Sequence, residues 1–181
     1  MKNANDFPDL YDDLFDFANA GYVMIDLSSP YHTEPDGIVK ELQYVSPDPD
    51  KYWMKGLMTK WHVTARGPLD PRVRQKHCYQ VIRESIAAPM VLGLGDIEVF
   101  PSPYEDEKYE CVVVRVDDYR LHNINEQFAV LPGVQTYIPY KPHLTLGYFK
   151  SEHTEELVQA LEDCLLDCVS FRGWDFGRME E

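Results

Sequence analysis

The stretch "WHVTARG" (residues 61–67) contains one His-x-Thr triplet, and "KPHLTLGYF" (residues 141–149) contains a second. Both triplets stand in runs rich in Val, Thr, Leu and Tyr, which favour β-strands. Successive side chains of a strand point to opposite faces, so each triplet presents its His and Thr together and turns its middle residue to the core. Two such strands lying near each other would bring two imidazoles and two hydroxyls to one cleft.

Working outward, the periodicity of the chain predicts alternating strands and helices around these two stretches. Pro- and Asp-rich residues 30–56 show no stable period and are expected to form a long loop with room for one helical turn. Asp70 is expected to cap a helix that reaches about residue 87. The other expected elements are helices at 7–19, 117–131 and 151–167, and strands at 21–29, 56–67, 89–100, 109–118, 136–150 and 168–174.

This order of elements predicts an α+β fold with two similar halves, each containing one triplet. Residues 1–181 are expected to form a single domain, with residues 1–20 as an N-terminal helical extension. An acidic turn joins the strand-like runs at 89–100 and 109–118. These two runs are therefore expected to form neighbouring strands.

Composition limits the possible partners. The chain has 31 acidic and 17 basic residues, a net charge of −14, and such a surface does not favour binding to long nucleic acids. No apolar run is long enough to span a bilayer, and the acidic N-terminus does not resemble a signal peptide. A cytoplasmic protein that does not bind membranes is therefore expected, and the four cysteines, which form no CxxC pair, are expected to be buried free thiols.

Two imidazoles and two hydroxyls suit a phosphate with a reacting oxygen on either side. A neutral histidine can take a proton from the attacking oxygen while a protonated one gives a proton to the leaving oxygen. The threonine hydroxyls can bind the remaining phosphate oxygens. Neither HxH nor HExxH occurs, so neither a metal nor another cofactor is expected.

A single His-x-Thr in a strand is common and indicates little by itself. The pair is more specific, because both copies lie at equivalent places in the two halves and a glycine, Gly67 or Gly147, follows each. We therefore expect His62 and His143 to be catalytic, with Thr64 and Thr145 as phosphate contacts. The other four histidines, in predicted helices, helix starts or loops, are expected to be structural; they are His32, His77, His122 and His153.

Paired HxT motifs in a two-lobed α+β domain resemble the 2H phosphoesterases, or LigT-like proteins. Residues 56–150 look most like phage-encoded members, because similar segments follow one another in the same order. In this chain they are "GLGDIEVF", "VVVRVD", "LHNIN" and "YKPHLTLGYF". The resemblance implies antiparallel sheets of two pseudo-symmetric halves lining a central cleft, with helices outside. It also implies metal-independent hydrolysis of cyclic di- or trinucleotides, as in phage anti-CBASS enzymes that counter a bacterial defence system.

Further substrate contacts are expected around the triplets. Arg66 alternates with Thr64, and it either reaches the phosphate or lies on the surface at the strand end. Lys141 alternates with His143 and is expected to contact the phosphate. Tyr148, in register with Leu144 and Leu146, is expected to face away from the site. Nucleobases stack well on aromatic rings, and the candidates for this role are Trp61, Tyr137, Tyr140, Tyr148 and Trp174, of which Tyr148 is the less favoured because of its expected direction.

Two other functions remain open at this point. The same site could act on a 2′,3′-cyclic phosphate at the end of RNA or of a nucleotide, and the fold could also bind a cyclic nucleotide without turnover. Retention of both titratable triplets counts against simple binding. The sequence decides neither the oligomeric state nor which histidine is the acid.

Overall fold

The structure is a computed structural model that describes residues 20–49, 54–85, 90–102, 108–134, 139–151 and 153–178. The helix expected at residues 7–19 lies outside the described residues. Within them, seven strands form one antiparallel sheet with the order β3-β7-β1-β2-β6-β5-β4. The strands are β1 (Gly21–Leu27), β2 (Trp61–Leu69), β3 (Val91–Gly93), β4 (Ile97–Pro101), β5 (Tyr109–Arg115), β6 (His143–Lys150) and β7 (Cys168–Arg178).

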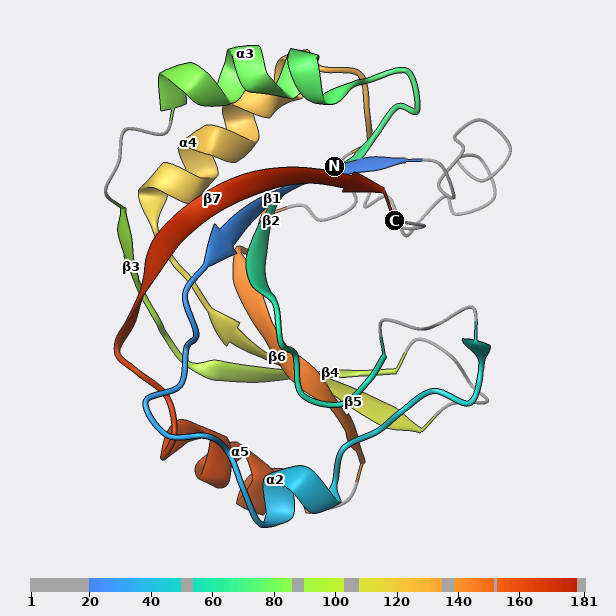
Figure 1. Cartoon of the computed structure of the whole chain (residues 1–181), viewed down its shortest axis with the longest axis vertical. Helices are drawn as coiled ribbons and strands as arrows, with labels where there is room; N and C mark the ends of the chain where they lie inside the picture. Colours follow the sequence, from blue (N-terminus) through green and yellow to red (C-terminus); the bar gives the residue numbers. More distant parts are fainter. Residues whose placement is uncertain are drawn as a thin grey trace.

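The sheet bends where β2 meets β6. These two strands share one directly paired position within the strands, Val63 with Leu144. Figure 1 shows the resulting two lobes, with β3, β7, β1 and β2 in one and β6, β5 and β4 in the other. Each triplet therefore lies on the strand of its lobe that borders the junction.

Helices cover one face of each lobe. α3 (Gln75–Ser85) and α4 (Tyr119–Gln127) lie outside the first lobe, and α2 (Ile38–Glu41) and α5 (Thr154–Glu162) lie outside the second (Figure 1). A 3₁₀ turn, Phe128–Val130, follows α4. The core fills the space between helices and strands, and its fully buried side chains include Val63, Leu121, Leu144 and Leu161. We call the sheet face opposite the helices the inner face.

The residues predicted as one strand at 89–100 form two strands in different lobes. β3 pairs with β7, whereas β4 pairs with β5. Between them the backbone crosses from lobe to lobe, because Leu94 N–H donates to Asp167 O and Gly95 N–H donates to Arg115 O. The neighbouring strands expected on either side of the acidic turn are confirmed for β4 and β5.

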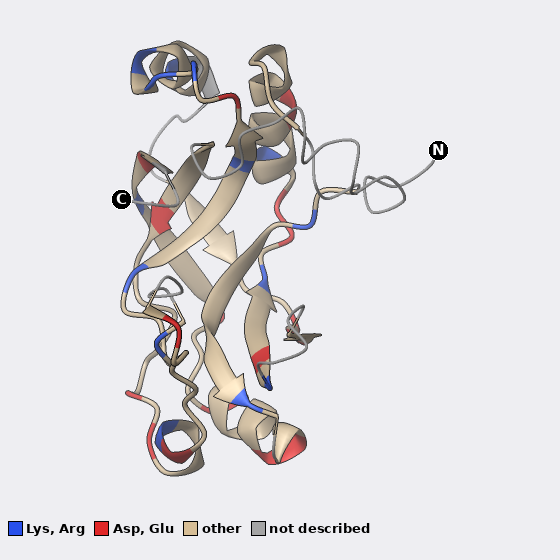
Figure 2. Cartoon of the chain, turned by 90° about the vertical axis from the view of Figure 1, so that its right-hand side faces the viewer, with Lys and Arg blue, Asp and Glu red and all other residues tan. Residues whose placement is uncertain are grey.

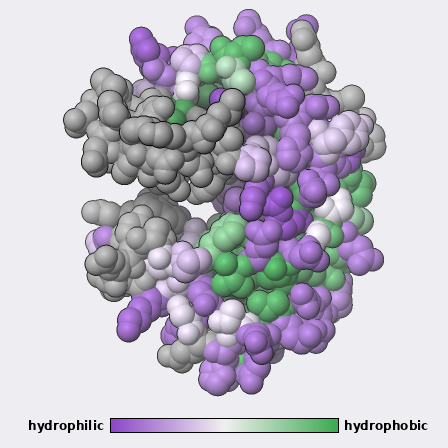
Figure 3. Space-filling view, turned by 180° about the vertical axis from the view of Figure 1, so that it is seen from behind, coloured by the Kyte–Doolittle hydropathy of each residue, from purple (hydrophilic) through white to green (hydrophobic). Residues whose placement is uncertain are grey.

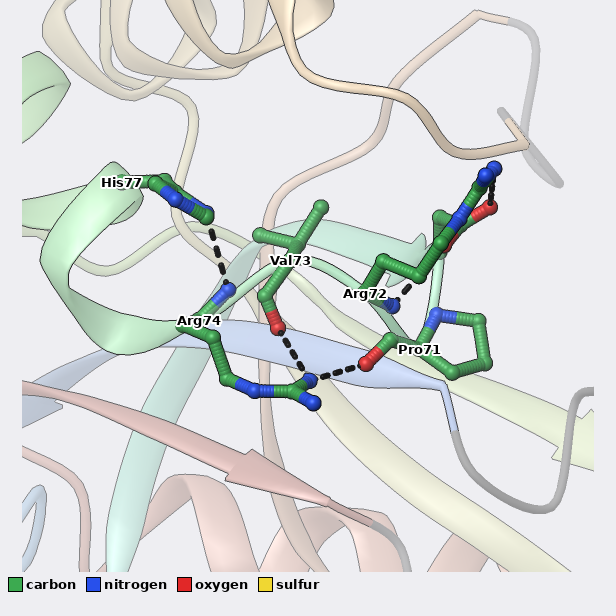
Figure 4. A network of polar contacts seen from close by, with 6 residues as sticks. Pro71, Arg72, Val73, Arg74 and His77 are labelled. Atoms are coloured by element: carbon green, nitrogen blue, oxygen red, sulfur yellow. Dashed lines mark hydrogen bonds and ion pairs between the residues drawn. The ribbon is translucent and has the colours of Figure 1, made fainter.

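α3 begins at Gln75, later than the predicted cap at Asp70. The preceding residues form a turn closed by side chains (Figure 4). Asp70 accepts a hydrogen bond from Arg72 N–H at 2.8 Å, and the Arg74 guanidinium donates to two backbone carbonyls of the turn. His77 Nδ1 accepts from Arg74 N–H at 3.1 Å, which satisfies a donor at the start of the helix and gives this histidine the expected structural role.

The described part of the long loop predicted at 30–56 packs against β6. It contains α2, and beyond that helix it runs beside the far end of β6, where Tyr44 N–H donates to Tyr148 O and Lys150 N–H donates to Leu42 O. Leu57 then bridges to Gly147. The loop thus widens the second lobe next to the junction.

Charge is sparse on the central strands. β1, β2 and β6 carry one charged residue each, namely Asp26, Arg66 and Lys150, and most charged positions fall on helices and loops (Figure 2). Seen from behind, the molecule is mainly hydrophilic, with an apolar area in its lower half (Figure 3). Among the described helices, none is long and apolar enough to cross a membrane. The four cysteines are free thiols, as expected, but only Cys78 is buried, Cys111 and Cys164 are half-buried, and Cys168 is exposed.

Candidate active site

The two triplets oppose each other across the junction. Val63 and Leu144 are direct partners in an antiparallel pair, so His62 lies opposite Thr145 and Thr64 lies opposite His143. Both middle residues are fully buried on the helix side, which places the four polar side chains on the inner face. Directly opposed residues have Cβ atoms roughly 4.5–5.5 Å apart. Two imidazoles and two hydroxyls therefore gather at one point between the lobes.

A β-bulge follows each triplet at the same position. In β2 the register passes from Met24–Thr64 to Val23–Arg66, which leaves Ala65 as an extra residue. In β6 it passes from Val113–Thr145 to Val112–Gly147, which leaves Leu146 as an extra residue. Bulges bend a strand and change the face to which the following residues point. The two halves of the protein thus share the triplet and also the irregularity behind it.

His62 has an acidic neighbour on the adjacent strand. Asp26 of β1 is its register partner and shares the inner face. Burial lowers the pKa of His62, the negative charge of Asp26 raises it, and the nearby His143 lowers it. The pKa of Asp26 is raised by burial and by Asp175, against the lowering effect of His62 and Lys60. His62 is therefore held near a carboxylate and close enough to His143 for their charges to interact.

His143 is oriented by the backbone that precedes β6. Its Nδ1 lies 2.9 Å from Lys141 O, and a carbonyl only accepts, so Nδ1 carries the proton. Nε2 is consequently the nitrogen that can exchange a proton with a substrate. The Phe100 ring of β4 packs edge-on against the imidazole, with ring centroids 5.8 Å apart. These contacts fix both the tautomer and the ring plane.

A basic side chain lies directly beside His143. Arg115 of β5 is the register partner of His143 and shares the inner face. Its Nε lies 3.6 Å from Glu98 Oε1, and its Nη1 is buried with no hydrogen-bond partner among the described residues. The sequence did not single out Arg115, because only the strand register shows that it adjoins a triplet.

On the inner face of the second lobe, the thiol of Cys111 contacts the side chains of Thr145 and Tyr148. Cys111 is the register partner of Tyr148. Burial raises the pKa of Cys111 to about 11, and hydrogen bonds with the Thr145 and Tyr148 side chains lower it in part. One sulfur reaches both groups, so Thr145 and Tyr148 share a face. The expectation that Tyr148 faces away is therefore wrong, because the bulge at Leu146 reverses the alternation.

The two tryptophans proposed for stacking lie on the wrong face. Trp61 pairs with Leu27 and packs edge-on against Tyr31, at a centroid distance of 6.3 Å. Trp174 pairs with Ile25 and packs against Tyr79 of α3. Both rings are packed against the core on the helix side, the face opposite to the four polar side chains of the triplets.

The other predicted contacts occupy different places. Arg66 pairs with the buried Val23 and is itself buried, because the bulge at Ala65 carries it to the helix side. Lys141 has an exposed side chain and contributes its carbonyl to His143. Tyr140 donates its hydroxyl to Thr64 O at 2.8 Å, and burial raises the pKa of that hydroxyl. This hydrogen bond links Tyr140 to β2, while the Tyr137 candidate lies outside the described residues.

No metal site is evident in the part of the chain that the structure describes. Within that part, no three His, Cys, Asp or Glu side chains come together as a metal ion would require. The chemistry available at the junction is that of two imidazoles, two hydroxyls, one carboxylate and one guanidinium.

The fold is similar to that of Usb1 from Kluyveromyces marxianus. Two solved structures of that protein, one of them with uridine monophosphate, match with TM-scores of 0.52 and 0.56 and sequence identities of 11% and 12%. Each comparison covers 91% of this chain and 96% of the other. The sequence matches no model of a known protein family and no curated protein. The structural similarity confirms the predicted two-lobed α+β architecture of the 2H phosphoesterase fold.

Proposed function

We propose that this protein is a metal-independent phosphodiesterase in which His62 and His143 act as an acid–base pair. The observation that carries the proposal is the direct pairing of Val63 with Leu144, because it brings both triplets to one place on the inner face. The pairing of two titratable groups is more than binding alone requires. For this reason we prefer an enzyme to a protein that only sequesters a nucleotide.

The reaction is an in-line displacement at phosphorus. The neutral histidine takes the proton of the attacking oxygen, which belongs to water or to a ribose 2′-hydroxyl, as the new P–O bond forms. The protonated histidine gives its proton to the leaving oxygen as the old P–O bond breaks. Thr64 and Thr145 donate to the non-bridging oxygens, and the two imidazoles finish with their protonation states exchanged.

Arg115 supplies the positive charge that such a phosphate needs. It adjoins His143, and its guanidinium has a buried nitrogen for which the described residues offer no acceptor. A phosphate oxygen between His143 and Arg115 would accept a charge-assisted hydrogen bond, which is stronger than a neutral one. Glu98 balances the guanidinium charge when the site is empty of substrate.

A nucleotide is the substrate class that we propose. One of the two similar solved structures is that of Kluyveromyces marxianus Usb1 with uridine monophosphate. The net charge of −14 favours a small substrate over a long nucleic acid. The sequence resemblance supports a cyclic di- or trinucleotide and a phage protein that counters CBASS immunity. A 2′,3′-cyclic phosphate at a nucleotide end is the second candidate, and the mononucleotide bound to the neighbour favours it.

Turnover assays separate these candidates. The protein is incubated in EDTA with 3′,3′-cyclic GMP-AMP, a cyclic triadenylate and a 2′,3′-cyclic mononucleotide, and products are followed by chromatography. Cleavage of a cyclic oligonucleotide supports the first candidate, and cleavage of the mononucleotide alone supports the second. Binding of these compounds without any cleavage would refute the proposed enzyme. His153→Ala, an exposed histidine at the start of α5, is the matched control for the triplet variants.

A further inference from the structure

We propose that Tyr140 and Asn125 are positioning residues that set the spacing of the two triplets. Their side chains bind the backbone carbonyls of Thr64 and Ala65, at the point where the two lobes separate. This inference rests on the proposed function and adds residues that act on the reaction through the two histidines. It follows from two hydrogen bonds behind the first triplet and from one proline before the second.

The backbone pairing of β2 with β6 stops directly behind the triplets. Val63 and Leu144 are directly paired. Two residues further along, the same antiparallel register sets Ala65 opposite Pro142. Proline has no N–H, so it offers β2 no backbone donor at that position. The Pro142 carbonyl instead accepts from Val116 N–H at 3.1 Å, at the end of β5. Beyond this point β2 needs other donors.

Tyr140 supplies the first of these donors. Its hydroxyl donates to Thr64 O at 2.8 Å. Tyr140 precedes His143 by three residues, and the carbonyl of the intervening Lys141 accepts from His143 Nδ1. One short segment therefore contacts the first triplet and carries the histidine of the second. A shift of this segment would move His143 relative to His62.

α4 supplies the second donor and supports the first. The Asn125 side chain is buried, and its Nδ2 donates at 2.7 Å to the carbonyl of Ala65, the extra residue of the bulge. Three residues earlier on α4, the His122 ring packs edge-on against the Tyr140 ring, with centroids 5.4 Å apart. Leaving a buried amide or carbonyl without a partner is costly, so these bonds favour one geometry of the bulge.

This geometry should affect the rate more than the affinity. Proton transfer at both ends of the displacement requires each imidazole within hydrogen-bond reach of its oxygen. A misplacement of about 1 Å can lower the rate by about 100-fold, even when the change lies far from the chemistry. Neither Tyr140 nor Asn125 lies on the face that receives the phosphate, so neither is expected to contribute to substrate binding.

The experiment removes single hydrogen bonds and separates kcat from KM. Tyr140→Phe deletes one hydroxyl and keeps the ring, and it should lower kcat by roughly 10- to 100-fold with KM little changed. The assay uses whichever of 3′,3′-cyclic GMP-AMP, the cyclic triadenylate and the 2′,3′-cyclic mononucleotide the wild type cleaves. Asn125→Leu should act in the same direction. Thermal melting shows that each variant folds.

The matched control is Tyr31→Phe. Tyr31 also has a buried hydroxyl, but that hydroxyl has no hydrogen-bond partner among the described residues. Its removal should therefore leave kcat unchanged. Equal kcat in Tyr140→Phe and Tyr31→Phe, or a rise in KM alone in Tyr140→Phe, would overturn the inference.

A double variant separates positioning from general support of the fold. In a His143→Ala background the acid–base pair is already broken, so adding Tyr140→Phe should lower kcat by less than about twofold. A loss as large as in the wild-type background would overturn the inference. A wild type that cleaves none of the three compounds would refute the proposed function and this inference with it. An active wild type whose kcat is unchanged by Tyr140→Phe would refute this inference alone.

Discussion

Val63 and Leu144 face each other across β2 and β6, and both are fully buried. Neither residue takes part in chemistry. Their pairing nevertheless decides where every reactive group lies, because the strand period of two places His62, Thr64, His143 and Thr145 together on the opposite face. The apolar middle residue of each triplet is therefore as important to the site as the polar ones.

The pH dependence of kcat/KM should be bell-shaped, since one imidazole must be neutral while the other is protonated. Asp26 raises the pKa of His62 against the effect of burial, so Asp26→Asn should lower that pKa further. The limb of the profile that follows His62 should therefore move to lower pH. Which limb moves identifies His62 as acid or base: the acidic limb if it is the base, the alkaline limb if it is the acid.

The control for this profile is Asp117→Asn, which changes an exposed carboxylate next to α4. A profile that is flat from acid to alkaline pH, or one in which both limbs of the Asp26→Asn variant coincide with those of the wild type, would contradict the pairing.

Arg115→Gln should lower kcat/KM by roughly 10- to 150-fold. The change removes a hydrogen bond to a charged group, which is worth about 1.5–3 kcal/mol. Arg115→Lys should recover part of the loss, because a lysine keeps the charge but not the planar fork. Arg172→Gln, at an exposed arginine of β7, provides the comparison. Equal rates for Arg115→Gln and Arg172→Gln would show that Arg115 does not contact the phosphate.

Trp174→Ala should destabilise the fold and leave substrate affinity intact. The ring packs against Tyr79 and the core on the helix side, and burying a large apolar side chain contributes about 2 kcal/mol. Urea unfolding measures the first effect and KM the second. A large rise in KM with unchanged stability would return Trp174 to the substrate site.

Thiol reactivity should single out one cysteine. Only the thiolate reacts quickly, and burial raises the pKa of both Cys78 and Cys111 to about 11. Burial and the charge of Asp163 also raise the pKa of the half-buried Cys164, whereas Cys168 is exposed. A chromogenic disulfide reagent should therefore show one fast phase in the native protein. Cys168→Ser should abolish that phase, and its persistence in this variant would mean that another of the cysteines is more accessible than the structure shows.

The sequence was sufficient for those features that follow from regular alternation. His-x-Thr in a strand has one geometric meaning, so the shared face of both triplets could be predicted before the strands were placed. The same alternation should have excluded Trp61, which is in register with Val63. The two-lobed architecture followed from the order of elements and from the resemblance to the 2H phosphoesterases.

Other features depended on irregularities that the sequence does not announce. Ala65 and Leu146 look like ordinary strand residues, yet each is the extra residue of a bulge. The bulges move Arg66 to the helix side and Tyr148 to the inner face. Regular alternation predicts the opposite face for each of these side chains. Arg115 became a candidate only through the register of β5 with β6. The one feature of the sequence that marks the two bulges is a glycine shortly after each triplet.

The most direct test is a double-mutant cycle on the two histidines, with kcat/KM measured in EDTA on whichever phosphodiester the wild type cleaves. His62→Ala and His143→Ala should each lower it by roughly a hundredfold or more, and the double variant should lose little beyond that, because the two groups act in one step. Near wild-type turnover in either single variant, or complete loss of wild-type activity in EDTA with rescue by zinc, would contradict paired-histidine catalysis.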